Sequence, residues 1–359
     1  MKMGKRKVLL VSYEMSYTGS PIAVLNLAKA FKKLKYEIDV WTLNEGKFQV
    51  EFEKLGIRVE SIAFKSMDNF IIEKRLSAYE YIIANTIFCV DFAEWASGFA
   101  NTILYIHEAQ NLVDLVKACN IRRKSIENIL NVFCVSEYAR KSILNQYNIK
   151  NLYVLPNYVE KVFLLKQKKK DNKIRFLVSG TYEYRKGQDV VEEAFLELPS
   201  EFREKAELHF VGAMPEWSRE YQDCIKKKQI DNIYIHNEIR DRTELFRFYD
   251  YMDVIVVASR DESCSLVALE AAMLKKCIFV TENTGALYVV ANKNFVLPTG
   301  DVKRLKQEMQ YVISINRRAL RHEGIENYKL YKKYGTKRIF CKQLKNIMEM
   351  IERGNESGK

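Results

Sequence analysis

Residues 253–285 read DVIVVASRDESCSLVALEAAMLKKCIFVTENTG, and this stretch decides the fold. Residues 253–259 form a short apolar, β-branched run, which is typical of a strand buried on both faces. A polar loop follows at 260–263, and residues 265–274 then place their apolar side chains at helical spacing. Residues 277–281 resemble a second buried strand. The order strand, loop, helix, strand predicts a parallel α/β sheet.

Two carboxylates stand at unusual places within this unit. Glu262 lies just beyond the carboxyl end of the first strand, where ligands bind in parallel sheets, and Glu270 lies inside the helix. The backbone amides of Cys264, Ser265 and Leu266 would open the helix, and such amides suit phosphate or sugar oxygens. The plain alternative is that Glu262 caps the helix and Glu270 is a solvated surface acid. Because strand, turn, helix and second strand are in register, the pattern favours a binding function.

Residues 262–271, ESCSLVALEA, resemble the donor-site signature of the retaining GT-B glycosyltransferases of family 4, the glycosyl transferases group 1. Cys264 stands where the family has an aromatic residue, and Ser263 and Ser265 replace glycines. The resemblance implies that Glu262 holds donor-sugar hydroxyls and Glu270 the nucleotide ribose. It also implies a GT-B α/β fold, in which two Rossmann-like doubly wound domains face a central cleft and a C-terminal helix crosses back to the first domain.

Length and composition fit this architecture. The 359 residues suit two domains of about 150–180 residues each. No apolar run approaches the ~20 residues of a membrane span. The seven cysteines are scattered without a C-x-x-C pair, which indicates a reducing cytoplasm and no structural zinc. For the net charge of +12, solvated faces are the first explanation, attraction to an anionic membrane the second and nucleic acid a distant third.

The whole chain alternates strand-like and helix-like segments. The strands predicted in the first domain are residues 8–12, 38–43, 59–63, 81–84, 102–106, 132–135 and 153–155. Those predicted in the second are 174–180, 208–211, 233–235, 253–259, 277–281 and 295–297. A charged segment near residue 165 sets the expected boundary between an acceptor-binding domain, 1–165, and a donor-binding domain, 166–335. A last helix over 336–352 is expected to belong with the first domain.

Two strand ends in the first domain carry candidate site residues. Gly19 and Ser20 lie in a predicted loop before a helix over 22–34, where glycine would allow close approach of backbone to ligand. A plain turn and helix cap explains the same pair equally well. His107, followed by Glu108, ends another strand and matches a recurrent feature of the family. Its imidazole would hydrogen-bond a sugar hydroxyl or act on the acceptor. A lone histidine more often has a structural role.

The second domain begins with a strand that ends in residues 180–187, GTYEYRKG, similar to the family pattern G-R-L-x-x-x-K-G. In that pattern an arginine and a lysine neutralise the donor diphosphate. Lys186 is in place, but Thr181 occupies the arginine position, and Arg185 is the neighbouring cation that would replace it. Ile239 lies in the loop where the family places backbone contacts to the base.

The resemblance implies a hexosyl-type retaining transferase that uses a nucleotide-diphosphate sugar and needs no cofactor. Since no D-x-D triplet stands at a strand end to hold a divalent ion, metal-independent transfer is expected. The acceptor would be a glycan or a lipid-linked glycan of bacterial surface polysaccharide synthesis, handled in the cytoplasm or at the inner membrane face. Two alternatives stay open: a nucleotide-sugar epimerase, and a non-catalytic GT-B partner or chaperone of another transferase. A nucleic-acid-binding module is disfavoured because no supporting motif is present.

Overall fold

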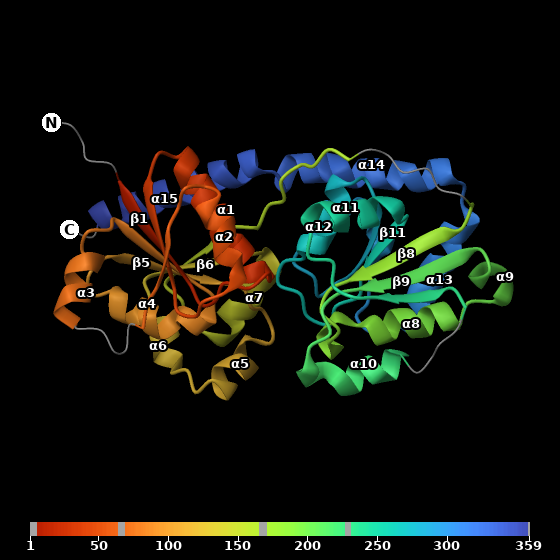
Figure 1. Ribbon diagram of the computed structural model, residues 1–359, viewed down its shortest axis with the longest axis horizontal. Helices are drawn as coiled ribbons and strands as arrows, with labels where there is room; N and C mark the ends of the chain where they lie inside the picture. The colour runs from red at the N-terminus through yellow and green to blue at the C-terminus, as the bar shows by residue number, and fades with distance from the viewer. Residues whose placement is uncertain (1–5, 64–68, 165–170, 227–230, 358–359) are drawn as a thin grey trace. The chain divides into compact units, whose positions relative to one another are not determined.

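The structure is a computed structural model that describes residues 6–63, 69–164, 171–226 and 231–357 (Figure 1). The chain divides into two compact units. The first contains residues 1–158 and 337–359, and the second contains residues 159–336. The boundary expected near residue 165 lies outside the described residues.

The described part of the first unit is built on a seven-stranded parallel sheet with the order β3-β2-β1-β4-β5-β6-β7. The strands are β1 (Lys7–Ser12), β2 (Glu37–Thr42), β3 (Val59–Ser61), β4 (Tyr81–Asn85), β5 (Asn101–Ile106), β6 (Asn131–Cys134) and β7 (Asn151–Val154). Residues 8–12 and 81–85 are fully buried, as expected for central strands of a sheet covered on both faces. The strand order reverses between β1 and β4, so a ligand crevice is expected there.

Helices cover both faces of this sheet (Figure 1). They are α1 (Gly19–Lys33), α2 (Val50–Glu53), α3 (Asn69–Leu76), α4 (Val90–Ala96), α5 (Leu112–Ala118), α6 (Arg123–Glu127), α7 (Glu137–Gln146) and α15 (Lys337–Ser357). The C-terminal helix α15 contacts α1 and thus belongs to the first unit. Its buried apolar residues, Phe340, Leu344, Ile347, Met348 and Ile351, recur at helical spacing and form one apolar face.

The second unit repeats this winding in a six-stranded parallel sheet with the order β10-β9-β8-β11-β12-β13 among the described residues. The strands are β8 (Ile174–Ser179), β9 (Ala206–Val211), β10 (Ile233–His236), β11 (Val254–Val257), β12 (Cys277–Thr281) and β13 (Val296–Leu297). Its order reverses between β8 and β11. The loops after these two strands therefore flank the expected binding crevice.

The helices of the second unit are α8 (Gln188–Leu196), α9 (Ser200–Arg203), α10 (Arg219–Lys226), α11 (Arg242–Tyr251), α12 (Leu266–Met273), α13 (Val302–Ser314) and α14 (Arg317–Tyr334). Helix α12 is buried over residues 268–273, so it lacks the solvated face that an amphipathic helix would have. Glu270 is only 2 % exposed, and the alternative of a solvated surface acid is wrong.

The predicted strands coincide with observed ones, with shifts of a few residues at their ends. The loop predicted at Gly19 and Ser20 is wrong, because both residues lie in the first turn of α1 and Thr18 is the N-cap residue. The short helices between β2 and β6 were not individually predicted, because segments of four to eight residues carry little periodicity. No helix in the described ranges is both long and apolar enough to cross a bilayer.

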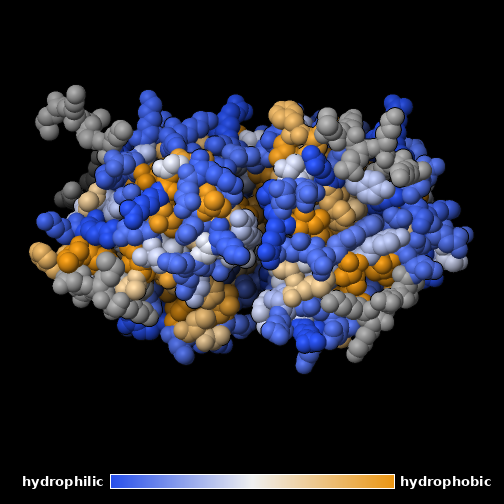
Figure 2. All heavy atoms as spheres, viewed as in Figure 1, coloured by the Kyte–Doolittle hydropathy of each residue, from blue (hydrophilic) through white to orange (hydrophobic). Residues whose placement is uncertain are grey.

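One face of the molecule is mostly hydrophilic (Figure 2). On the face in Figure 2, hydrophilic residues cover most of the described area and hydrophobic residues form small separate patches. Isolated apolar residues of this kind are normal on a protein surface.

Gly187, which ends the loop after β8, is predicted to be intolerant of a side chain. Its φ is +68°, and a Cβ atom there would lie 2.2 Å from the carbonyl oxygen of Ala258. Gly187→Ala is expected to cost about 2–4 kcal/mol, since backbone strain and a backbone clash act together. Gly300 has a φ of +77°, but a Cβ atom there would meet no atom within 4 Å, so Gly300→Ala should cost only the strain, about 1–3 kcal/mol. Urea unfolding of both variants would contradict this account if they lost equal stability.

Candidate functional site

Lys186 and Glu262 meet at the point where the strand order of the second sheet reverses. Lys186 comes from the loop after β8 and Glu262 from the loop after β11, and the lysine Nζ donates a hydrogen bond to Glu262 Oε2. The guanidinium of Arg185 lies 3.7 Å from the same oxygen. Two predicted cations and one predicted carboxylate thus share one place at the carboxyl edge of the sheet.

The backbone fixes Glu262 in this position. Its amide donates to Asn283 O at 3.0 Å, and the amide of Gly285 donates to Glu262 O at 2.8 Å. Burial raises the pKa of the Glu262 carboxyl, but Lys186 and Arg185 lower it by more, and the pKa lies below its ordinary value. Glu262 is therefore a fixed anion that accepts hydrogen bonds, and it does not cap the following helix.

Thr181 occupies the position of the family's arginine, and Arg185 is the cation that the same loop supplies instead. Its guanidinium pairs with Glu183 at 2.6 Å and donates to Asp261 O at 2.9 Å. The carbonyl oxygen of Thr181 accepts a hydrogen bond from Gln188 Nε2 at 2.8 Å, so this residue serves the loop backbone. The loop thus presents Arg185 and Lys186 together, and the charge at the site does not depend on an arginine at position 181.

Glu270 is held by a residue that the sequence analysis missed. Arg242, the first residue of α11, pairs with Glu270 Oε1 at 2.6 Å while its guanidinium lies 4.6 Å from the ring centre of Phe246. Only 3 % of the Glu270 side chain is exposed, against 47 % of Arg242. A cation at the start of a helix is repelled by the positive end of the helix dipole. The unfavourable position of Arg242 was therefore the one sequence signal that it has a specific acidic partner.

The start of α12 holds the other predicted residues of the signature. Ser265 is its N-cap, and the Ser265 hydroxyl accepts from Ala268 N at 3.2 Å. Cys264 is buried, Ser263 is half-buried and Leu266 is the first helical residue. Ile239 lies in the loop between β10 and α11 and is half-buried, and no described contact joins it to Glu262 or Lys186.

In the first unit, a second group of predicted residues is joined through Asn85, which the sequence analysis did not single out. His107 Nε2 lies 2.8 Å from Asn85 Oδ1, and Asn85 Nδ2 donates to Ser20 Oγ at 2.8 Å. Asn85 ends β4 and His107 follows β5, so both lie at the carboxyl edge of the sheet. Gly19 only begins α1.

His107 and Glu108 are both half-buried, and burial changes their pKa values in opposite directions. It lowers the pKa of His107 from 6.5 to about 3. It raises the pKa of Glu108 from 4.5 to about 7. The imidazole is therefore neutral near pH 7, where Glu108 titrates.

These two residues predict opposite effects of pH on folding stability. Between pH of about 3 and 6.5 the unfolded state binds more protons at His107, so this residue makes stability rise with pH. Between 4.5 and about 7 the folded state binds more protons at Glu108, so stability falls with pH. Compared with the unsubstituted protein, Glu108→Gln should show a change of stability from pH 4.5 to 6.5 that is more positive in urea unfolding, and His107→Gln one that is more negative. Identical pH profiles for both variants would contradict the assignment.

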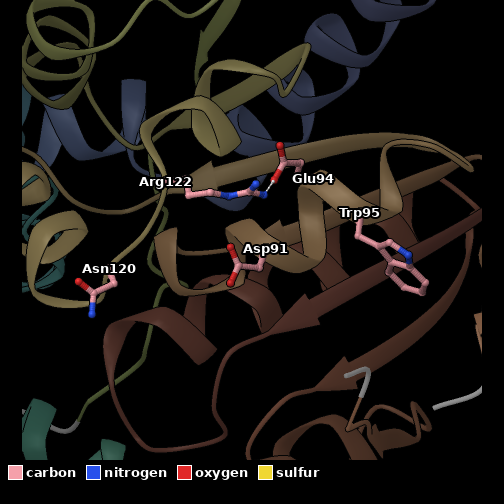
Figure 3. A pocket seen from close by; sticks show the side chains of 5 residues that line it. All are labelled: Asp91, Glu94, Trp95, Asn120 and Arg122. Atoms are coloured by element: carbon pink, nitrogen blue, oxygen red, sulfur yellow. Dashed lines mark hydrogen bonds and ion pairs between the residues drawn. The ribbon is translucent and has the colours of Figure 1, made fainter. Parts of the chain in front are cut away.

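A cavity of about 500 Å³ lies elsewhere in the first unit. Asp91, Glu94, Trp95, Asn120 and Arg122 line it. Arg122 points toward Glu94 and pairs with it at 2.8 Å, whereas the indole of Trp95 is directed away from both (Figure 3). None of the predicted site residues lines this cavity. Within the described ranges, no group of three or more His, Cys, Asp or Glu residues is arranged to hold a metal ion.

Two parallel sheets wound in the same order define the fold as GT-B, and solved structures agree. A glycosyltransferase from Rickettsia africae has a TM-score of 0.79 at 17% identity, covering 97% of this chain and 98% of that chain. HepE from Anabaena, solved with UDP and glucose, has a TM-score of 0.78 at 13% identity, covering 96% of this chain and 99% of that chain. Sucrose-phosphate synthase from Thermosynechococcus elongatus has a TM-score of 0.75 at 14% identity, covering 98% and 100%.

The family follows from the sequence of the second unit. Residues 161–331 match the family model for glycosyl transferases group 1. This match confirms the resemblance to glycosyl transferases group 1 that residues 262–271 carry. A comparison with curated proteins gives no match.

Proposed function

We propose that the chain is a retaining, hexosyl-type glycosyltransferase that uses a nucleotide-diphosphate sugar as donor. The family of residues 161–331 supports sugar transfer. The observation that carries the finer proposal is the convergence of Lys186, Arg185 and Glu262 where the second sheet reverses its strand order. HepE, which shares the fold, was solved with UDP-glucose, and this supports UDP as the first nucleotide to test.

In the proposed reaction, the cations act on the leaving group. A departing nucleoside diphosphate gains negative charge, and fixed cations stabilise that charge best when they need not reorganise. Lys186 and Arg185 are already fixed by Glu262, Glu183 and Asp261. Glu262 would orient the donor sugar and Glu270 would hold the ribose. Because two chain cations can neutralise the diphosphate, we expect activity to persist in EDTA.

The acceptor in this proposal is a glycan or lipid-linked glycan that binds the first unit. The neutral imidazole of His107, positioned by Asn85, can hydrogen-bond a sugar hydroxyl without adding a charge. The net charge of +12 supports peripheral contact with an anionic membrane, as a step in bacterial surface polysaccharide synthesis would require.

Thermal-shift screening with UDP, GDP, dTDP and CMP sugars tests the proposal. A donor at 100 times its Kd should stabilise the protein by about 2.7 kcal/mol, because it binds only the folded state. If none of the nucleotide sugars raises the melting temperature, the proposal is refuted. Conversion of a donor to its epimer without acceptor would indicate an epimerase. Donor binding without transfer or hydrolysis would indicate a non-catalytic partner, for which the threonine at position 181 is the sequence argument.

A further inference from the structure

A third arginine, Arg260, joins the two loops that carry the site residues. It lies in the loop after β11, two residues before Glu262, and its amide donates to the carbonyl oxygen of Arg185 at 2.7 Å. Its guanidinium donates to the carbonyl oxygen of Tyr184 at 2.5 Å. Tyr184, Arg185 and Lys186 form one 3-10 turn after β8. Arg260 therefore contacts the backbone of the turn that carries both site cations.

The guanidinium of Arg260 is itself held by a carboxylate and an aromatic ring. Two of its N–H groups donate to Asp189, the second residue of α8, at 2.9 and 2.6 Å. The ring of Tyr184 covers one face, with its centre 3.7 Å from the Arg260 Cζ atom. The Tyr221 hydroxyl donates to the same carboxylate at 2.7 Å. Because only 22 % of the Arg260 side chain is exposed, these contacts are largely shielded from water.

The pair between Arg260 and Asp189 is ionised at neutral pH. Burial raises the pKa of the Asp189 carboxyl, but hydrogen bonds from Arg260 and Tyr221 lower it by more, and the pKa lies below its ordinary value. Two parallel hydrogen bonds between an arginine and a carboxylate also fix their relative orientation. The turn 184–186 is thus held at its first residue and again just beyond its last, at the start of α8.

We propose that Arg260 is a positioning residue that holds the turn 184–186 so that Lys186 and Arg185 are in place for the donor diphosphate before it binds. This inference rests on the proposed function. The ion pairs of Lys186 and Arg185 compete with a bound phosphate for the same cations, whereas the contacts of Arg260 to the backbone of the turn do not. Cations on a fixed backbone lose less conformational freedom on binding, and they stabilise developing charge without reorganisation.

The test compares the binding of UDP and UMP by calorimetry, because the ratio of the UMP to the UDP dissociation constant measures what the β-phosphate gains from the cations. In the unsubstituted protein this ratio should be about tenfold or more. In Arg260→Ala it should fall to about threefold or less. Arg260→Lys keeps the charge without the planar fork and should give an intermediate ratio. If thermal shift selects another base, its diphosphate and monophosphate replace UDP and UMP.

Arg317→Ala is the matched control, because Arg317 joins the amino ends of the same two strands. It pairs with Asp253, just before β11, at 3.2 Å, and donates to the carbonyl oxygen of Lys173, just before β8, at 2.9 Å. Its side chain is 29 % exposed, close to the 22 % of Arg260. This variant loses contacts of the same kind at the edge away from the site, so its ratio should stay within about twofold of the unsubstituted protein.

Three results would overturn the role of Arg260. These are an unchanged ratio in Arg260→Ala, an equal fall in Arg317→Ala, and a ratio near one in an unsubstituted protein that binds UDP. If Arg260→Ala does not fold, Arg260→Lys decides, and a ratio equal to that of the unsubstituted protein would count against the role. Failure of the unsubstituted protein to bind any nucleoside diphosphate would instead refute the proposed function, so the two failures are distinguishable.

Discussion

Lys186→Ala is expected to lower the rate of sugar transfer about 10²–10³-fold, the range seen when one preorganised charge-stabilising group is removed. The lysine is fixed on Glu262 and only 21 % of its side chain is exposed, so its charge acts with little screening. Arg185, 3.7 Å from the same carboxylate oxygen, keeps one cation at the site, so activity should not vanish. Initial rates with a donor identified by thermal shift measure the effect, and most of the loss should be in kcat.

Loss of folding must be separated from loss of function in this variant. Removing the lysine leaves the buried Glu262 charge with Arg185 as its remaining nearby cation, so some stability should also be lost. The double variant Lys186→Ala, Glu262→Gln removes that charge and should regain stability, while its transfer rate stays no higher than that of Lys186→Ala. Lys306 pairs with Glu197 at 2.6 Å in the same unit, and Lys306→Ala should keep full activity. A Lys186→Ala variant within threefold of full activity would refute the assigned role.

Arg175→Ala is expected to destabilise the second unit by about 3–5 kcal/mol, the cost of breaking a buried ion pair by removing one partner. Only 2 % of the Arg175 side chain is exposed. Its guanidinium pairs with Asp171 at 2.6 Å and Glu207 at 2.7 Å, and it lies 4.5 Å from the ring centre of Tyr251. Removing it leaves the Glu207 side chain, of which 12 % is exposed, with the longer ion pair to Lys173 at 3.5 Å. Urea unfolding followed by circular dichroism measures the loss.

An exposed pair provides the matched comparison. Arg240 and Glu238 pair at 2.9 Å, but 73 % of the arginine side chain is exposed. Arg240→Ala should therefore change stability by less than about 1 kcal/mol. The double variant Arg175→Leu, Glu207→Leu should lose less than Arg175→Ala alone, since it leaves no such buried charge. Equal losses in Arg175→Ala and Arg240→Ala would show that burial does not set the cost.

The sequence predicts the sheets better than the polar contacts for a physical reason. Central strands such as 254–257 are continuous apolar runs, so the local composition alone predicts that they are buried. The contact between Lys186 and Glu262 also follows from topology, because the loops after neighbouring parallel strands open at one edge.

The partners of the site residues could not be predicted in this way. Arg242 reaches Glu270 from another helix, and Asn85 joins His107 to Ser20 from a different strand, so neither contact leaves a local pattern. The burial of Glu270 could not be predicted either, because helix α12 is enclosed by neighbours that its own sequence does not specify.

The connection of α15 to the first unit has a consequence for biosynthesis. The first seven strands leave the ribosome early, but the helix that packs on α1 is made only after all of residues 159–336. At about 5–20 residues per second this delay is roughly ten to forty seconds. During that interval the nascent chain carries an uncovered apolar surface on α1, which is the kind of surface that chaperones bind.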